Sequence, residues 1–292
     1  MQSFFEKKTN QWLTLGLLAL TWGSSFILME KGLVAYSDTQ VASLRLVFAG
    51  LVLLPVSIRR IRHLPKKTLI PIFLVGLVGN GIPAFLFTKA ETVIDSSTAG
   101  IINALAPLFT LLIGISFFHL KARWVHGLGI LVGLAGAVAL LYDDMHIGGK
   151  AGYAGLAIIA TVCYGFSINI VKGYLHSVPA TEIASIGLLF VGLPSGIYLF
   201  STDFTQHFST HPDAWTSLGY IMILGMVGTA FAVSIFNMLI KSTSHLFAAS
   251  VTYLIPIVAI FWGLFDGESM DIRKIIAILT ILVSIYLVNR KT

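Results

Sequence analysis

Apolar runs of about 20 residues recur along the whole chain, and this feature limits its fold more than any other. A helix of that length crosses a bilayer core, which is about 30 Å thick. Of the 292 residues, 56% are hydrophobic and only 11% are charged, whereas soluble domains carry about 25% charged residues. The sequence therefore predicts an all-α integral membrane protein.

The apolar runs, separated by charged or turn-rich breaks, predict ten transmembrane helices. Their expected ranges are 11–32, 40–58, 69–88, 97–118, 124–142, 152–171, 182–200, 216–239, 246–265 and 272–289. The connections are short, and none is long enough for a soluble domain. The first run, preceded by Lys7 and Lys8, also resembles a signal peptide, but an internal repeat pairs it with a later span and favours its retention.

Lysine and arginine are distributed unevenly between alternate loops. Thirteen lie in the set of loops that includes both termini, five lie in the other set, and Arg45 lies inside a span. Because cytoplasmic loops carry the excess of these residues, we expect a multi-pass membrane protein with both termini in the cytoplasm. This distribution also accounts for the net charge of +6 without a nucleic-acid partner, so the expected surroundings are the lipid bilayer.

The two halves of the sequence resemble each other. The segment Q-V-A-S-L-R-L-V-F-A-G-L at 40–51 aligns with E-I-A-S-I-G-L-L-F-V-G-L at 182–193, an offset of 142 residues. Further along, the offset is 149 residues and aligns Pro107 with Pro256. We therefore expect two five-helix repeats, 1–145 and 146–292. Because five is odd, the repeats would be inverted relative to each other, as in many secondary transporters, whose substrate sites lie near the midplane.

Several motifs resemble the EamA-type transporters of the drug/metabolite transporter superfamily. They are T-W-G-S-S-F in the first span, L-R-L-V-F-A-G-L in the second, A-L-A-P-L-F-T-L-L in the fourth and G-L-G-I-L-V-G-L-A-G-A-V-A-L-L in the fifth. The resemblance implies an inner-membrane carrier that moves small metabolites and often exports amino acids. Such transporters often place a Glu just after the fourth span. This chain has His119 there, whereas its second repeat keeps Asp266-Gly267-Glu268.

Polar and aromatic side chains occur at equivalent places in the spans of both repeats. Polar groups within spans usually face a bundle interior or a watery cavity, so we expect them to line a substrate pathway. The expected pathway residues are Trp22, Ser24, Ser25, Arg45, Asn80, Phe85, Asn103, Tyr164, Asn169, Asn237, Thr252 and Tyr253. Amides, hydroxyls and aromatic walls suit a small zwitterion. Alternatively, the Ser, Thr and Asn side chains only tie helices together, at about 0.6 kcal/mol per contact.

Pro83, Pro107 and Pro256 lie inside expected spans. Proline removes a backbone donor and frees a carbonyl of the preceding turn. We therefore expect these positions to act as hinges or to expose backbone groups to substrate. A static kink is the alternative interpretation.

Arg45 lies five residues into the second span, about 7–8 Å from its non-cytoplasmic end, where it can also snorkel. One interpretation is an ion pair with an acid on the same side of the membrane: Glu30, Asp38, Glu91 or Asp95. The other is an electropositive lining that attracts a substrate carboxylate. Its repeat equivalent is Gly187, so the charge distinguishes the two halves.

No nucleotide-binding, zinc-protease or nucleophile-elbow motif occurs in the sequence. We therefore expect no enzyme activity, no cofactor and no metal site. The spans contain almost no acid, and Glu30, Glu91 and Glu182 lie near span ends, which favours facilitated diffusion over proton antiport. The expected function is a secondary transporter, monomeric or alternatively dimeric, that exports amino acids or related compounds by alternating access. Alternatives are a drug or nucleoside exporter of the same superfamily and a membrane-embedded enzyme.

Overall fold

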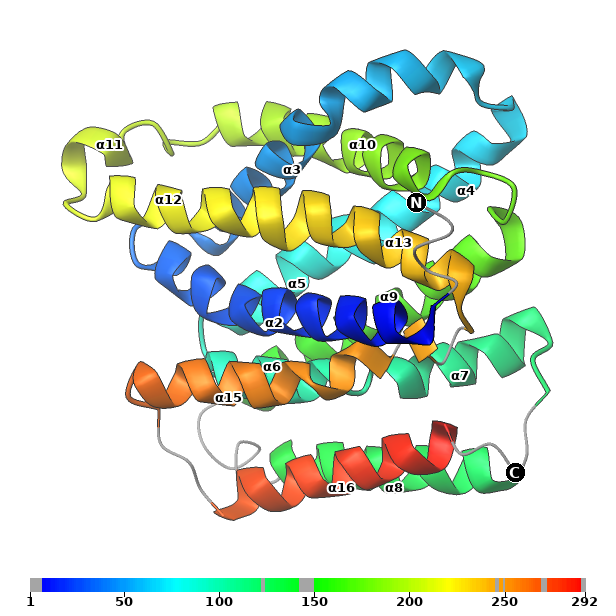
Figure 1. The fold of residues 1–292 in the computed structure, drawn as a ribbon. Helices are drawn as coiled ribbons and strands as arrows, with labels where there is room; N and C mark the ends of the chain where they lie inside the picture. The colour runs from blue at the N-terminus through cyan, green and yellow to red at the C-terminus, as the bar shows by residue number, and fades with distance from the viewer. Residues whose placement is uncertain are drawn as a thin grey trace.

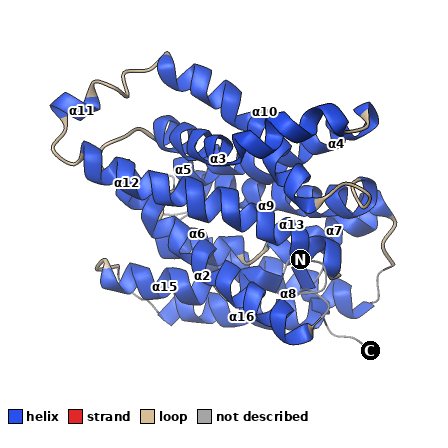
Figure 2. Ribbon diagram, turned by 45° about the horizontal axis from the view of Figure 1, so that its top comes forward, coloured by secondary structure: helices blue, strands red, loops and turns tan. Residues whose placement is uncertain are grey.

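A computed structural model describes residues 7–121, 124–141, 150–244, 247–248, 250–268 and 272–289. The described residues form helices joined by turns and short loops, and they include no β-strand. Most of the helices lie side by side in one bundle (Figure 1). Figure 2 shows the same bundle by secondary structure, with one longer connection around the short helix α11 (His207–Thr210).

Helices overlap all of the ranges expected from the sequence. In the first half they are α2 (Lys8–Leu33), α3 (Asp38–Arg60), α4 (Lys66–Gly76), α5 (Ile82–Ala90), α6 (Ser96–Asn103), α7 (Ala106–Phe118) and α8 (Trp124–Leu141). In the second half they are α9 (Lys150–Tyr174), α10 (Ala180–Phe200), α12 (Ala214–Gly225), α13 (Ala232–Ser242), α15 (Ile255–Phe265) and α16 (Ile272–Asn289). Four short segments complete the described helices: η1 (Ile61–His63), η2 (Leu77–Gly81), η3 (Met226–Phe231) and η4 (Ser250–Tyr253).

Seven described stretches are long and apolar enough to cross a membrane. They are Lys8–Leu33, Asp38–His63, Lys66–Ala90, Ser96–Phe118, Lys150–Tyr174, Ala180–Phe200 and Ala214–Ser242. Two shorter apolar helices, Trp124–Gly133 and Ile255–Phe265, lie in the ranges expected for the fifth and ninth spans. The chain is thus an all-helical, multi-pass membrane protein, in which seven of the ten expected spans meet this criterion within the described residues.

The start of α3 is fixed by a capping box. The Ser37 hydroxyl accepts a hydrogen bond from the Gln40 backbone N–H at 3.3 Å, and the Gln40 side chain accepts one from the Ser37 N–H at 3.0 Å. Such a reciprocal pair satisfies two backbone donors that have no partner within the helix. Gln40 also donates to Asp203 Oδ1 at 2.8 Å, which ties this helix end to the connection after α10. The cap therefore fixes the start of α3, and Arg45 lies about two helical turns after it.

The packing of the helices is reciprocal between the two halves. The helix α3 packs along α10, and α8 packs along α16 in the lowest layer of Figure 1. In the centre, α2 contacts α12, α13 and α15, while α9 contacts α4, α5, α6 and α7. The sequence repeat aligns α2 with α9, and each of them contacts the third and fourth predicted spans of the other half.

Four interruptions occur within the helices of the expected spans. Two are π-helical turns, η2 and η3, which begin at Leu77 and Met226, the same 149-residue offset that relates the repeats. The other two separate α6 from α7 and η4 from α15, and there Pro107 and Pro256 lie in the first turn of the next helix. Pro83 likewise lies in the first turn of α5, directly after η2. A first-turn proline disturbs no intrahelical bond of its own helix.

Glycines allow backbones to touch at two equivalent places. A Cβ atom added to Gly76 would lie 2.3 Å from the Gly187 carbonyl oxygen, and one added to Gly225 would lie 2.7 Å from the Arg45 carbonyl oxygen. In both cases an interrupted helix lies directly against the backbone of the long helix beside it. Only a residue without a Cβ atom fits there, because the atom that would be struck is backbone.

We therefore expect Gly76→Ala to destabilise the protein, by about 1–3 kcal/mol as in other overpacked cores. The matched control is Gly219→Ala in α12, since a Cβ atom there meets nothing within 4 Å. Thermal unfolding of the detergent-purified variants measures both. Equal unfolding temperatures for the two variants would show that the α4–α10 contact is looser than described.

Candidate functional site

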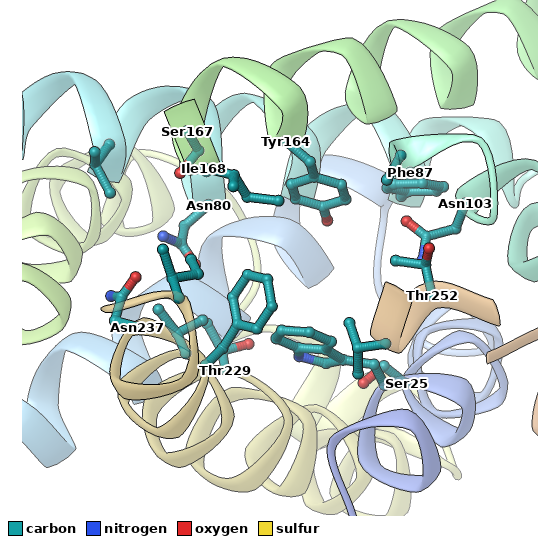
Figure 3. Close-up of a pocket in the computed structure, with 18 of the residues that line it drawn as sticks. Ser25, Asn80, Phe87, Asn103, Tyr164, Ser167, Ile168, Thr229, Asn237 and Thr252 are labelled. Atoms are coloured by element: carbon teal, nitrogen blue, oxygen red, sulfur yellow. The ribbon is translucent and has the colours of Figure 1, made fainter. Parts of the chain in front are cut away.

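A cavity lies in the middle of the bundle (Figure 3). It brings together side chains from both halves of the chain. The expected pathway residues among them are Trp22, Ser25, Arg45, Asn80, Asn103, Tyr164, Asn237 and Thr252. Thr229 and Ser167 also line the cavity.

Three of the expected pathway residues lie elsewhere. Ser24 accepts a hydrogen bond from the Trp262 indole at 2.8 Å on another face of α2. Phe85 packs in a separate apolar cluster. Asn169 is fully buried and donates to the backbone carbonyls of Thr110 and Gly165 at 2.9 and 2.8 Å, so it ties α9 to α7. The side chain of Tyr253 lies outside the described part of the chain.

Two aromatic pairs line the cavity. Trp22 meets Phe236 edge to face with ring centroids 4.8 Å apart, and Tyr164 stacks on Phe87 at 6.1 Å. The offset from Trp22 to Tyr164 is 142 residues and that from Phe87 to Phe236 is 149 residues, so the same two positions of the repeat make both pairs. The Trp22 indole also donates to the Gly228 carbonyl in η3 at 2.9 Å.

The helix interruptions place polar groups at the cavity. Asn80 lies in η2 and Thr229 in η3, whereas Asn103 ends α6 and Thr252 lies in η4. Figure 3 shows Asn80 and Asn237 on one side of the cavity and Asn103 and Thr252 on the other. The amide nitrogen of Asn237 is buried and has no hydrogen-bond partner in the described structure. Because buried donors are normally paired, this nitrogen is suited to a polar ligand.

Arg45 extends from α3 to the cavity, which it lines. Its Nε donates to the Thr229 hydroxyl at 2.8 Å, and its Nη1 lies 3.7 Å from the Met29 sulfur. The Thr229 hydroxyl in turn donates to the Leu224 carbonyl at 3.1 Å. The expected ion pair is not found: no carboxylate of the described residues lies within 4.0 Å of Arg45, and Asp38 pairs with Lys89 at 3.3 Å instead.

Comparison with known proteins identifies the family. The sequence profile of the EamA-like transporter family matches residues 11–142 and 152–290, one match in each half of the chain. The chain belongs to the EamA-like transporter family. The expectation drawn from the motifs of the first, second, fourth and fifth spans is thereby confirmed.

Several curated relatives of this EamA-like transporter are themselves named as transporters. It is 27% identical to the uncharacterized inner membrane transporter YedA of Escherichia coli K12, over 93% of this chain and 88% of YedA. It is 25% identical to a probable terminal-alkyne amino-acid exporter of Streptantibioticus cattleyicolor, over 94% and 92% of the two chains. It is 26% identical to an S-adenosylmethionine/S-adenosylhomocysteine transporter of Chlamydia trachomatis, over 87% and 81%.

A solved structure shares the fold of this transporter. It superposes with a TM-score of 0.65 and covers 97% of this chain and 98% of its own, at 17% sequence identity. At that identity the likeness extends to the fold alone. It covers nearly the whole of both chains, so the shared fold extends along nearly the whole of this chain.

The geometry of the cavity predicts which positions water-soluble reagents reach. In a Cys163→Ala background, which removes the single native cysteine, we expect Asn237→Cys to react with a charged thiosulfonate reagent. Asn169→Cys is the matched control, since Asn169 is fully buried outside the cavity. Mass spectrometry of the purified variants gives both rates, and we expect Asn237→Cys to react at least about tenfold faster. Equal rates would mean that water does not reach the cavity at Asn237.

Proposed function

We propose that this EamA-like transporter is a secondary carrier that exports a small carboxylate-bearing metabolite, an amino acid or a related compound, across the inner membrane. The observation that carries the proposal is the Arg45 guanidinium, which borders the cavity without a carboxylate partner in the described structure. A guanidinium always carries its charge, and its fork of donors matches a carboxylate.

The energetics favour a ligand that supplies the missing negative charge. Hydrogen bonds to charged groups contribute about 1.5–3 kcal/mol each, and a charge taken from water without a partner is destabilising. A substrate carboxylate at Arg45 would offset that loss. The amides of Asn80, Asn103 and Asn237 could then bind the ammonium group or other polar parts, and the aromatic pairs could enclose the side chain.

Two relatives support this substrate class. One is named as a probable amino-acid exporter. Another is named as a transporter of S-adenosylmethionine and S-adenosylhomocysteine, compounds that contain an amino-acid moiety. Both are near one-quarter identical to this chain, so they favour the class of substrate and not one compound.

Alternating access would follow from ten spans in two inverted repeats, 1–145 and 146–292. The separate family matches to the two halves and the reciprocal contacts of α2 and α9 support that arrangement. The first described helix begins, and the last one ends, at the same right-hand edge of the bundle in Figure 1, as an even number of spans requires. If each half can take up the conformation of the other, the same cavity can open to either side.

Pro107 and Pro256 are the proposed hinges, together with Pro83. Each begins a helix directly after an interruption, where fewer backbone hydrogen bonds oppose bending. Pro107 and Pro256 occupy equivalent positions of the repeat, so bending at both would move the two halves in the same way. Alternating access needs such paired bending, because the two states differ by an exchange of conformation between the halves.

The aromatic pairs favour one alternative substrate class. Trp22 with Phe236 and Tyr164 with Phe87 present ring surfaces to the cavity, and planar bases stack well on such rings. A nucleoside or a planar drug would use these walls. It would leave Arg45 unpaired, which is why we prefer a carboxylate substrate.

Replacing Arg45 distinguishes these classes. In proteoliposomes, we expect Arg45→Gln to raise KM about 10–100-fold for carboxylate substrates, because one or two charge-assisted bonds are lost. Transport of the corresponding amino-acid amides, which lack the carboxylate, should change little. Arg60→Gln is the control, since Arg60 lies at the end of α3, away from the cavity, and is 60% exposed.

The uptake screen uses labelled amino acids, nucleosides and cationic dyes, each with an imposed substrate gradient. Movement of amino acids with unchanged KM in Arg45→Gln would remove the role given to Arg45. Movement of nucleosides or dyes alone would support the alternative class. No gradient-dependent movement of any probe would count against the whole proposal.

The proposed topology has a separate test. Fusion of a fluorescent protein after Thr292 should give fluorescent cells, because the C-terminus is expected in the cytoplasm, and fusion of alkaline phosphatase after Asp203 should give an active phosphatase on the opposite side. The excess of Lys and Arg on one side is the physical reason. Two fusions that report the same side would overturn the predicted orientation.

A further inference from the structure

Three carboxyl groups from different helices meet at one end of the bundle. Glu30 lies near the end of α2, Glu91 directly follows α5, and Glu268 follows α15. Glu91 is only 7% exposed, and both of its carboxylate oxygens are buried without a partner in the described structure. One carboxylate oxygen of Glu30 and one of Glu268 are also buried and unpartnered there. The charges of the three groups act on one another.

The position of Glu268 depends on two glycines. Gly267 has a φ of 90°, a left-handed conformation that glycine adopts readily, and it turns the chain back toward α15. The Glu268 carboxylate then lies against Gly263, where an added Cβ atom would be 2.5 Å from its Oε2. Its other oxygen accepts a hydrogen bond from the Ser96 hydroxyl at 2.6 Å. The local sequence thus directs this acid into the protein.

The cations around this carboxyl cluster are engaged elsewhere. Lys31 forms an ion pair with Asp266, and Lys89 pairs with Asp38 at 3.3 Å. Arg45 acts electrostatically on Glu91 but forms no ion pair with it. The described residues provide no group of three or more His, Cys, Asp or Glu side chains placed to hold a metal ion. The positive charge that fits the unpaired oxygens is therefore a proton.

Burial favours the protonated form of Glu91. Desolvation raises the pKa of Glu91 well above its usual value, the neighbouring Glu30 raises it further, and Arg45 acts in the opposite direction. An isolated buried carboxylate normally neutralises in this way. The charged groups that act on Glu91 are thus Glu30, Glu268 and Arg45, with Lys31 and Asp266 acting on Glu30 beside it.

We propose that Glu91, supported by Glu30 and Glu268, is a proton-binding site whose occupancy is linked to the binding of an anionic group at Arg45. When Arg45 has no ligand, its charge favours the ionised form of Glu91. A substrate carboxylate that binds Arg45 cancels that charge, so Glu91 takes up a proton from the adjoining aqueous phase and releases it when the substrate leaves. By thermodynamic reciprocity, proton binding strengthens anion binding by the same factor. The substrate half of this linkage rests on the proposed function.

The proton site is tested on the protein alone, without substrate. In the unfolded chain Glu91 ionises near its usual pKa, whereas the folded protein keeps the proton to higher pH. Stability is therefore lost as pH rises from the usual pKa of Glu to the folded one. We expect the unfolding temperature of the detergent-purified wild type to fall by several degrees between about pH 5 and about pH 8, and to change much less in Glu91→Gln, whose amide imitates the protonated carboxyl.

Glu182→Gln is the matched control, because Glu182 lies at the other end of the bundle near Arg60, 3.7 Å away. It should keep the wild-type pH dependence. Arg45→Gln tests the linkage, since loss of the cation should shift the pH-dependent fall to higher pH. Wild-type dependence in Glu91→Gln, or no shift in Arg45→Gln, overturns the proposal whatever the substrate is.

Transport adds a second measurement on the wild type. For a carboxylate substrate, KM should rise by up to about tenfold per pH unit once Glu91 ionises, as one linked proton requires, and Glu91→Gln should remove this dependence. A KM that is independent of pH in the wild type overturns the linkage. Absence of any carboxylate transport contradicts the proposed function instead, and the unfolding measurements still decide whether Glu91 binds a proton.

Discussion

Backbone hydrogen bonding inside the membrane is the constraint on which the rest of this structure depends. Lipid cannot satisfy an N–H or C=O group, so irregular backbone is tolerated only where protein or a cavity covers it. The interruptions η2, η3, the break after α6 and η4 all border the central cavity. At η3 the Trp22 indole covers the Gly228 carbonyl, and Thr229 bonds Leu224 and Arg45. The interruptions place polar groups at the cavity. They therefore also need side chains from other helices to form hydrogen bonds with the groups that the interrupted helix leaves unpaired.

The two halves differ in the charged side chains that they carry at equivalent positions. Close contacts recur at equivalent positions, as Gly76 with Gly187 and Gly225 with Arg45 show, so backbone packing needs no charge there. The Arg45 side chain has no counterpart at Gly187. Likewise Glu268 is matched at the 149-residue offset by His119. The packing framework is thus shared, whereas the charged groups at the cavity and at one end of the bundle belong to particular halves. This difference is what would give a symmetric carrier distinct behaviour on its two sides.

The sequence predicted the helices and many cavity residues, because hydropathy and the repeat report which segments are buried and which positions correspond. It could not predict which face of a helix points inward. Ser24 and Ser25 are neighbours, yet a helix turns by about 100° between them, and only Ser25 lines the cavity. For the same reason the sequence pointed to Phe85, whereas Phe87 is the phenylalanine that lines the cavity. The π-helical turns were also missed, since one extra residue per turn leaves no mark on an apolar run. Asn169 was misplaced because a buried amide can equally tie two helices together.

Glu91 shows how a local environment changes an energetic conclusion. Its place at a span end suggested that water solvates it, and this favoured facilitated diffusion over proton coupling. That argument required an exposed carboxylate, whereas Glu91 is 7% exposed with both oxygens buried and unpartnered in the described structure. Glu91 is buried and Arg45 acts on it electrostatically, so in the proposed linkage a proton on Glu91 and an anion at Arg45 each make the binding of the other more favourable. The solvation argument therefore does not hold for Glu91, and proton coupling is the proposal that its burial supports.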